Sequence, residues 1–151
     1  MIPSRINFFF NRFSSHLRPA MPATIINVPA IDKLDEVIND TVDKHQGKNI
    51  YLYFYASIDP ATGVSWCPDC VAAGPIIQQG FSELDDSVIL VDVPVGDRPT
   101  WKNPEHPYRH RTDAITAVPT LFHLNTKKRL VEEKCTKENL TEFLSESARE
   151  F

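Results

Sequence analysis

The stretch Trp66-Cys67-Pro68-Asp69-Cys70 holds two of the three cysteines in this chain and decides how the rest is interpreted. It follows an unbroken apolar and aromatic run at residues 50–55, which is typical of a buried strand. After it, apolar residues recur at helical spacing over residues 71–81. The cysteine pair is therefore predicted to lie where a strand ends and a helix begins. In that setting the C-x-x-C spacing indicates dithiol redox chemistry.

The position of each cysteine on this helix suggests its role. Only a thiolate attacks a disulfide, and the positive end of a helix dipole favours negative charge on a sulfur at the helix start. If Cys67 caps the helix, Pro68 takes the first helical position, where its missing N–H costs nothing. Cys70 then lies one turn inside, within reach of a mixed disulfide on Cys67. We predict that Cys67 is the nucleophile and Cys70 the resolving thiol.

The two residues between the cysteines are expected to set the redox potential. Asp69 in the first turn suits the helix dipole, but its charge opposes a thiolate on Cys67. These effects have opposite signs. The sequence therefore predicts that Pro68 and Asp69 set the redox potential but not whether they raise or lower it.

Composition places the chain among ordinary globular proteins. Its 151 residues suffice for one domain with a core, and 42% of them are hydrophobic and 24% charged. The net charge of −4 argues against a nucleic-acid partner, and no apolar run reaches the roughly 20 residues that span a bilayer. Three cysteines do not make a secreted disulfide framework. We therefore expect a reducing compartment, the cytoplasm, and a monomer with neither a nucleic-acid nor a membrane partner.

The first residues differ from the rest. Up to Pro29 the chain has three arginines and no acidic residue, and its apolar residues would share one face of a helix. Such a segment resembles a mitochondrial transit peptide, and the alternatives are a disordered extension or a true start at Met21. We assign residues 1–22 to this extension and residues 23–151 to the folded domain. A transit peptide would change the predicted compartment to the mitochondrion.

Periodicity along the domain predicts an α/β fold. The expected strands and helices alternate first and then give way to a hairpin and a last helix, which implies a mixed sheet of four to five strands with helices on both faces. Strands are predicted at residues 24–28, 51–55, 88–93, 120–124 and 129–133. Helices are predicted from an N-cap at Asp32 to a stop at Gly47, from 68 to about 84, and after Thr136. Prolines break residues 94–112 into loop and short helical turns.

Several motifs together resemble a known family. The cysteine motif, Pro75 inside its helix, and Ala117-Val118-Pro119-Thr120 before a hairpin resemble the thioredoxin superfamily. More narrowly, residues 65–71, residues 95–102 and a cysteine at position 135 look like the thioredoxin domain-containing protein 17 family, which comprises small thioredoxin-related disulfide reductases. The resemblance covers about residues 24–147, and the Pro-Asp pair between the cysteines is its most specific element.

This resemblance implies a thioredoxin-like fold and a reductase activity. It implies a cis bond between Val118 and Pro119 that faces the cysteines, and a groove in which Trp66, Val118, Pro119 and Thr120 hold an extended substrate. It further implies electrons from NADPH through thioredoxin reductase, with no cofactor bound to the protein itself. The implied substrates are small disulfides such as cystine and selected protein disulfides.

Two features depart from ordinary thioredoxin. Tyr53 occupies the place of a buried acid that moves a proton to or from the resolving thiol, so Asp69 or water is expected to handle that proton instead. The loop at residues 57–64 is longer, and together with the segment around residues 101–111 it is expected to narrow access to Cys67.

Other interpretations stay open at this stage. Both cysteines with His106 and His110 have the ligand types of a zinc site, although the spacing is far longer than in a zinc finger. The alternative for both histidines is an exposed position in a loop. Cys135 fits a small buried residue or a regulatory thiol, and Trp101 fits a packing or a substrate-contacting residue. The competing functions are a non-catalytic thioredoxin-like module that binds partners or senses redox state, and a peroxidatic enzyme.

Overall fold

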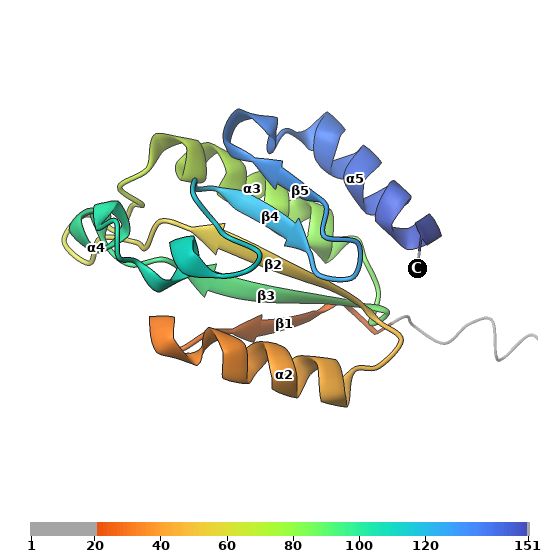
Figure 1. Cartoon of the computed structure of the whole chain (residues 1–151). Helices are drawn as coiled ribbons and strands as arrows, with labels where there is room; N and C mark the ends of the chain where they lie inside the picture. The colour runs from red at the N-terminus through yellow and green to blue at the C-terminus, as the bar shows by residue number, and fades with distance from the viewer. Residues whose placement is uncertain (1–20, 151) are drawn as a thin grey trace, which may run out of the picture.

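The computed structural model describes residues 21–150, and its centre is a mixed sheet of five strands in the order β1-β3-β2-β4-β5 (Figure 1). The predicted extension therefore lies almost entirely outside the described residues. The strands are β1 (Thr24–Asn27), β2 (Asn49–Tyr55), β3 (Val88–Pro94), β4 (Thr120–His123) and β5 (Arg129–Val131). The α-helices are α2 (Leu34–Lys44), α3 (Pro68–Ser82), α4 (Arg98–Lys102) and α5 (Lys137–Glu150), with 3-10 turns η1 (Ile31–Lys33), η2 (Pro107–His110) and η3 (Glu132–Lys134).

The direction of the strands follows from their connections. β1 and β2 both run parallel to β3, because a helix connects them across the sheet, whereas β4 runs antiparallel to β2 and forms a hairpin with β5. Four helices cover the two faces of this sheet, with α2 below it and α3 and α5 above it in Figure 1. The chain thus has the α/β, thioredoxin-like fold that the sequence predicted.

Alternation along β2 divides the core into two clusters. Phe54 and Leu52 point to the face covered by α2, which we call the α2 face, where they meet Trp101 from α4 and Tyr108 from η2. Tyr51, Tyr53 and Tyr55 point to the opposite face, which we call the α3 face, where α3 and α5 pack. Because side chains in a strand alternate, neighbouring residues of β2 serve different cores.

Most predicted boundaries agree with the structure to within a few residues. β2 begins two positions before the predicted strand, and α3 ends at Ser82 rather than near residue 84. The Thr136 hydroxyl accepts a hydrogen bond from the Asn139 N–H at 3.2 Å, so this residue caps α5 as predicted. Pro75 lies inside α3.

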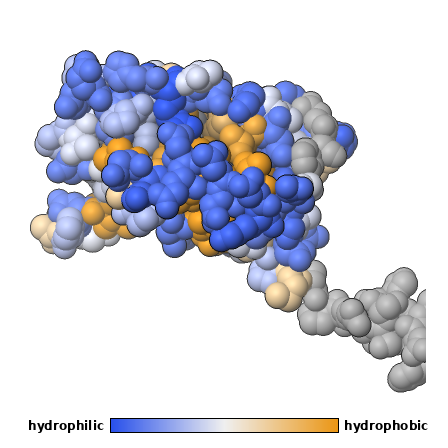
Figure 2. Space-filling view, turned by 60° about the horizontal axis from the view of Figure 1, so that its bottom comes forward, coloured by the Kyte–Doolittle hydropathy of each residue, from blue (hydrophilic) through white to orange (hydrophobic). Residues whose placement is uncertain are grey.

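The surface seen from the α2 side is mostly hydrophilic, with apolar side chains showing between polar ones (Figure 2). Within residues 21–150 no helix combines the length and the apolar character that a membrane crossing requires.

Candidate redox site

The cysteine pair lies where β2 leads through a loop into α3. Cys67 is the N-cap of α3 with an extended backbone, and Pro68 occupies the first turn, as predicted. The Cys67 side chain is partly exposed, and its sulfur lies 3.7 Å from the Val118 carbonyl oxygen. One sulfur of the pair is thus open to another molecule and sits at the positive end of a helix.

Cys70 is placed very differently. It is 5% exposed, and its sulfur accepts a hydrogen bond from the Ala56 N–H at 3.4 Å. Burial raises the pKa of the Cys70 thiol to about 12; the Ala56 N–H opposes that rise, while the side chain of Cys67 and the charge of Asp69 add to it. Cys70 therefore remains protonated at neutral pH. Neither Cys67 nor Cys70 is in a disulfide.

A set of hydrogen bonds fixes the segment before the motif. The Ser65 hydroxyl donates to the Ala56 carbonyl at 3.0 Å and accepts from the Cys67 N–H at 3.3 Å. The Trp66 indole N–H donates to the Gly96 carbonyl at 3.0 Å, which ties the motif to the loop after β3. Trp66 is partly buried against the core of the α2 face, so it is held in place beside the sulfurs rather than free to move.

The peptide bond between Val118 and Pro119 is cis, as the resemblance implied, and this turn faces Cys67. Val118 is 7% exposed and Thr120 2%, and the Thr120 hydroxyl donates to the Ala117 carbonyl at 2.8 Å. The Thr120 side chain therefore holds the turn from within. Among residues 21–150 the Val118 N–H has no hydrogen-bond partner, so the turn leaves one backbone donor unused near Cys67.

Asp69 is exposed in the first turn of α3, and its charge raises the pKa of both Cys70 and Cys135. Cys135 is 5% exposed, and its sulfur donates to the Leu130 carbonyl at 3.7 Å. Burial is the main reason why the pKa of Cys135 rises to about 11. This environment is that of a buried residue with little thiolate.

The candidate zinc ligands are not gathered at the cysteines. His106 is buried, which corrects the expectation of an exposed loop residue: one ring nitrogen lies 2.9 Å from the Val95 carbonyl and the other accepts from the Tyr108 N–H. His110 is exposed and bonds to the Pro104 carbonyl. No group of three or more metal-binding side chains occurs in the part of the chain that the structure describes.

Trp101 is a packing residue. It is 2% exposed in the core of the α2 face, and the Arg109 guanidinium lies 4.2 Å from the centre of its ring. The segment around residues 101–111 thus closes the α2 face of the domain.

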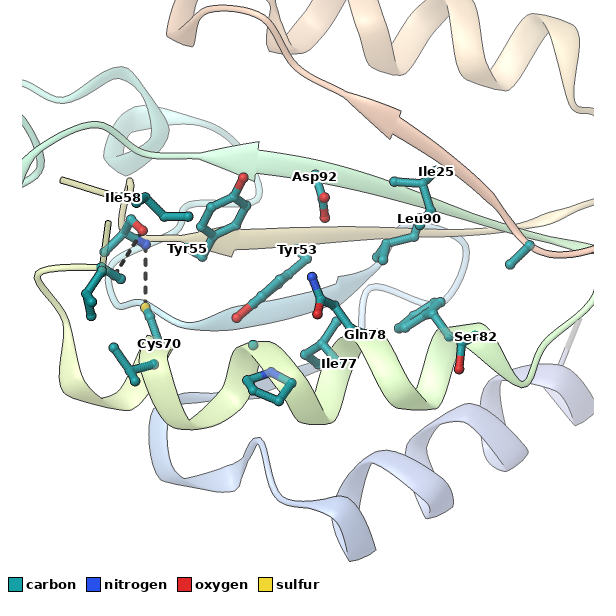
Figure 3. A pocket seen from close by; sticks show the side chains of 18 of the residues that line it. Ile25, Tyr53, Tyr55, Ile58, Cys70, Ile77, Gln78, Ser82, Leu90 and Asp92 are labelled. Atoms are coloured by element: carbon teal, nitrogen blue, oxygen red, sulfur yellow. Dashed lines mark hydrogen bonds between the residues drawn. The ribbon is translucent and has the colours of Figure 1, made fainter. Parts of the chain in front are cut away.

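One functional candidate escaped the sequence analysis. Asp92 on β3 is the register partner of Tyr53 on β2, so both side chains lie on the α3 face. They line a cavity that also reaches Cys70 (Figure 3). The signal in the sequence is a single acid inside the apolar run of residues 88–94, whose pattern predicts only a strand.

Comparison with known proteins agrees with this geometry. Residues 28–147 match the family model described as thioredoxin domain-containing protein 17-like, thioredoxin domain. Thioredoxin domain-containing protein 17 of Homo sapiens is 40% identical over 109 residues, which cover 72% of this chain and 87% of the relative. Thioredoxin-like protein Clot of Arabidopsis thaliana is 43% identical over 89 residues, 58% of this chain and 65% of the relative.

A solved structure shares the fold at low sequence identity. A chain in the crystal structure of the ferredoxin:thioredoxin reductase and thioredoxin f2 complex superposes with a TM-score of 0.54 at 17% identity, over 83% of this chain and 96% of that chain. This likeness supports a thioredoxin-like fold.

Proposed function

Since this chain belongs to the thioredoxin domain-containing protein 17-like family, and so has a thiol–disulfide redox role in general terms, we propose that it is a disulfide reductase acting through Cys67 and Cys70. The observation that carries the proposal is the contrast within the pair. Cys67 is accessible at a helix start, whereas Cys70 is buried, protonated and one turn away. A buried thiol directly behind an exposed one suits a reaction in two steps.

In the first step the Cys67 thiolate attacks one sulfur of a substrate disulfide. A Cys67–substrate disulfide forms, the substrate S–S bond breaks, and the leaving thiolate takes up a proton. In the second step Cys70 loses its proton and attacks the Cys67 sulfur, which forms the Cys67–Cys70 disulfide and releases the second substrate thiolate. The dithiol loses two electrons and the substrate disulfide gains them.

The turn at Val118 offers a place where a substrate backbone can bind beside Cys67. Its N–H has no partner in the described part of the chain and its carbonyl lies beside the Cys67 sulfur, so an extended substrate backbone can pair with both groups as a strand would. Such a contact recognises the backbone of the substrate and does not depend on its side chains. The substrate class that we propose is accordingly small disulfides such as cystine and accessible disulfides in proteins.

The oxidised protein requires a reductant. We propose that NADPH supplies the electrons through thioredoxin reductase, which would itself exchange disulfides with Cys67.

A trapping experiment tests the roles of the two sulfurs. Cys70→Ser should accumulate a mixed disulfide through Cys67 when it is mixed with a disulfide substrate, because the second step is blocked. Cys67→Ser should accumulate much less, since Cys70 is buried. Mass spectrometry of the trapped species locates the bond, and trapping through Cys70 would reverse the assignment.

A coupled assay tests the activity and its substrates. NADPH and thioredoxin reductase are supplied together with cystine, insulin or glutathione disulfide, and NADPH oxidation is followed with the wild type and Cys67→Ser. Turnover of cystine by the wild type but not by Cys67→Ser supports the proposal. Turnover with glutathione disulfide only would indicate a different reductase class, and no turnover with any substrate would favour a binding module.

A further inference from the structure

A cavity of about 760 Å³ lies directly behind the buried cysteine, between α3 and the strands β1, β3 and β2 (Figure 3). Cys70 lies at one end of it, and apolar side chains such as Leu90 and Ile77 form much of its wall. The sheet contributes three polar side chains to its lining, Tyr53, Tyr55 and Asp92. A space of this size with polar groups on its wall is large enough to admit water molecules.

Asp92 is the unusual member of this group. Its side chain is half-buried, and it has no hydrogen-bond or ion-pair partner among residues 21–150. Burial alone raises the pKa of its carboxyl. A carboxylate that is partly withdrawn from water without a protein partner costs stability, so its presence calls for a functional reason.

Tyr53 connects Asp92 to the redox pair. The two residues are register partners on one face of the sheet, and Figure 3 shows the Tyr53 hydroxyl pointing towards α3 on the side of Cys70. Burial and, next, the charge of Cys70 raise the pKa of Tyr53, and the charge of Asp92 acts on it as well. Tyr53 thus lies within electrostatic reach of both the sulfur and the carboxylate, and all three line one cavity.

The other titratable groups near Asp92 do not offer the same path. Tyr55 lies on β2 and is itself shifted to a higher pKa by burial and by Asp92, while β1 contributes no titratable side chain. Cys135, which directly follows η3, also raises the pKa of Tyr53 through its charge. Asp69 is exposed in the first turn of α3 and does not line the cavity.

We propose that Asp92 receives the proton that Cys70 loses as it attacks the mixed disulfide, with water in this cavity carrying the proton past the Tyr53 hydroxyl. The proposal rests on the reductase function proposed above. The Cys70 sulfur forms its bond to Cys67 as its proton passes to the Asp92 carboxylate, and the released substrate thiolate is protonated from solvent. Asp92 later returns its proton to solvent through the cavity, so no further reactant is needed.

The second step needs such an acceptor because Cys70 is a poor acid. Once Cys67 is bonded to a substrate, its hydrogen bond and charge no longer raise the pKa of Cys70, but burial and the charge of Asp69 remain. In the mixed disulfide, a base connected to the buried sulfur lowers the barrier to attack by Cys70. General-base assistance is typically worth about 100-fold or more in rate.

Release of thionitrobenzoate from dithiobis(nitrobenzoate) separates the two steps in the intact protein. Cys67 attack releases one equivalent in a phase whose rate depends on reagent concentration. Cys70 attack then releases a second equivalent in a phase that does not, because it is intramolecular. Cys70→Ser, which should release only the first equivalent by this route, identifies the phases.

In Asp92→Asn the second phase is expected to slow about tenfold or more, while the first phase is unchanged. The matched control is Asp86→Asn, which removes the same charge from an exposed position just before β3. Asp92→Glu should restore much of the rate. The ratio of wild-type to Asp92→Asn rates is followed from about pH 5 to about pH 9. It should be largest near neutral pH and should approach one at high pH, where hydroxide ionises the thiol directly.

The possible failures are distinct. If the first phase is absent from every variant, the reductase function itself is wrong. If the first phase is present but the second has the same rate and pH profile in the wild type and Asp92→Asn, only the role of Asp92 is wrong. A slow second phase in Asp69→Asn, with a normal one in Asp92→Asn, would assign the proton to Asp69. Near-UV circular dichroism confirms that each variant is folded.

Discussion

The two faces of the sheet are built in contrasting ways although they share every strand. On the α2 face, Phe54, Trp101 and Tyr108 are each at most 2% exposed and pack around an apolar centre. On the α3 face, the same strands place Tyr53 and Asp92 beside a cavity of about 760 Å³. The α3 face has a buried core of its own where α3 and α5 pack on the sheet, so the open space is local to the part near Cys70. Close packing elsewhere supplies the stability that allows this part to keep an open space and a carboxylate that cost stability.

The cysteine pair lies where the two faces meet. Cys67 and Trp66 pack partly against the core of the α2 face, and Cys70 belongs to that core while it also lines the cavity on the α3 face. We therefore expect substitutions on the α2 face to lower stability and those around the cavity to alter the chemistry. Paired substitutions can test this division, because adjacent strand residues point to opposite faces.

The largest effect is expected at Phe54, whose ring lies edge-on to Tyr108 at 5.6 Å in the closed core. Phe54→Ala should lower the free energy of unfolding by about 3–5 kcal/mol, because it leaves a cavity among close-packed rings. The neighbour on the other face, Tyr55→Ala, should cost roughly half as much or less, since Tyr55 is only half-buried. Urea unfolding measures both, and equal losses would contradict the contrast between the faces.

His106 should give the next largest effect, with a characteristic pH dependence. Burial lowers the pKa of His106, with the Arg109 charge adding to it and the Val95 hydrogen bond opposing it. His106→Gln should cost about 1–3 kcal/mol at neutral pH through lost hydrogen bonds and ring contacts. A lowered pKa makes the neutral form part of the folded state, so this stability is present above the ordinary pKa of about 6.5 and declines as the pH falls below it.

The measurement is the free energy of unfolding of both proteins from neutral pH down to about pH 5. The gap between wild type and His106→Gln should narrow on acidification, because only the wild type must protonate a buried ring. A constant gap would mean that His106 titrates alike in the folded and unfolded states.

The sequence was informative where local pattern decides structure. The aromatic run before the cysteines, the proline after Cys67 and the threonine before α5 each act within a few residues, so the strand, the helix start and the cap could all be predicted. The role of Pro119 at the site came from family resemblance, since a cis bond has no local signature that distinguishes it from a trans one.

The sequence was uninformative where distant residues decide the environment. His106 looked like a loop residue, and only its contact with the Val95 carbonyl makes it part of the core. Asp92 lies in a strand, but its importance depends on its register with Tyr53 and on the cavity beside α3. Parallel pairing brings together residues that are far apart in sequence, and no periodicity within one segment reveals it.

Asp92 should respond to pH in the direction opposite to His106. Burial raises the pKa of its carboxyl above the ordinary 3.8, so the protonated form is favoured in the folded protein. The stabilising contribution of protonated Asp92 to the free energy of unfolding is thus present below the pKa that its carboxyl has in the unfolded chain. It is lost as the pH rises through the higher pKa of the folded protein. Asp92→Asn should unfold at a slightly higher temperature than wild type at neutral pH, and this advantage should shrink towards about pH 4.

The control is Asp86→Asn, which removes the same charge from an exposed side chain. Loss of stability in Asp92→Asn at neutral pH would show that the carboxylate has a stabilising partner in solution, and it would remove the argument that Asp92 is retained for function.

The smallest effect is expected at the edge of the cavity, on β1. Ile25 is 58% exposed on the α3 face, whereas its neighbour Ile26 packs against the core of the α2 face. Ile25→Thr should change the free energy of unfolding by no more than about 0.5 kcal/mol, while Ile26→Thr should cost about 1–2 kcal/mol, because only the second removes buried apolar surface. Urea unfolding at one pH compares them. A loss of more than about 1 kcal/mol in Ile25→Thr would mean that the rim of the cavity is covered in solution, and the open character of the α3 face would then have to be abandoned.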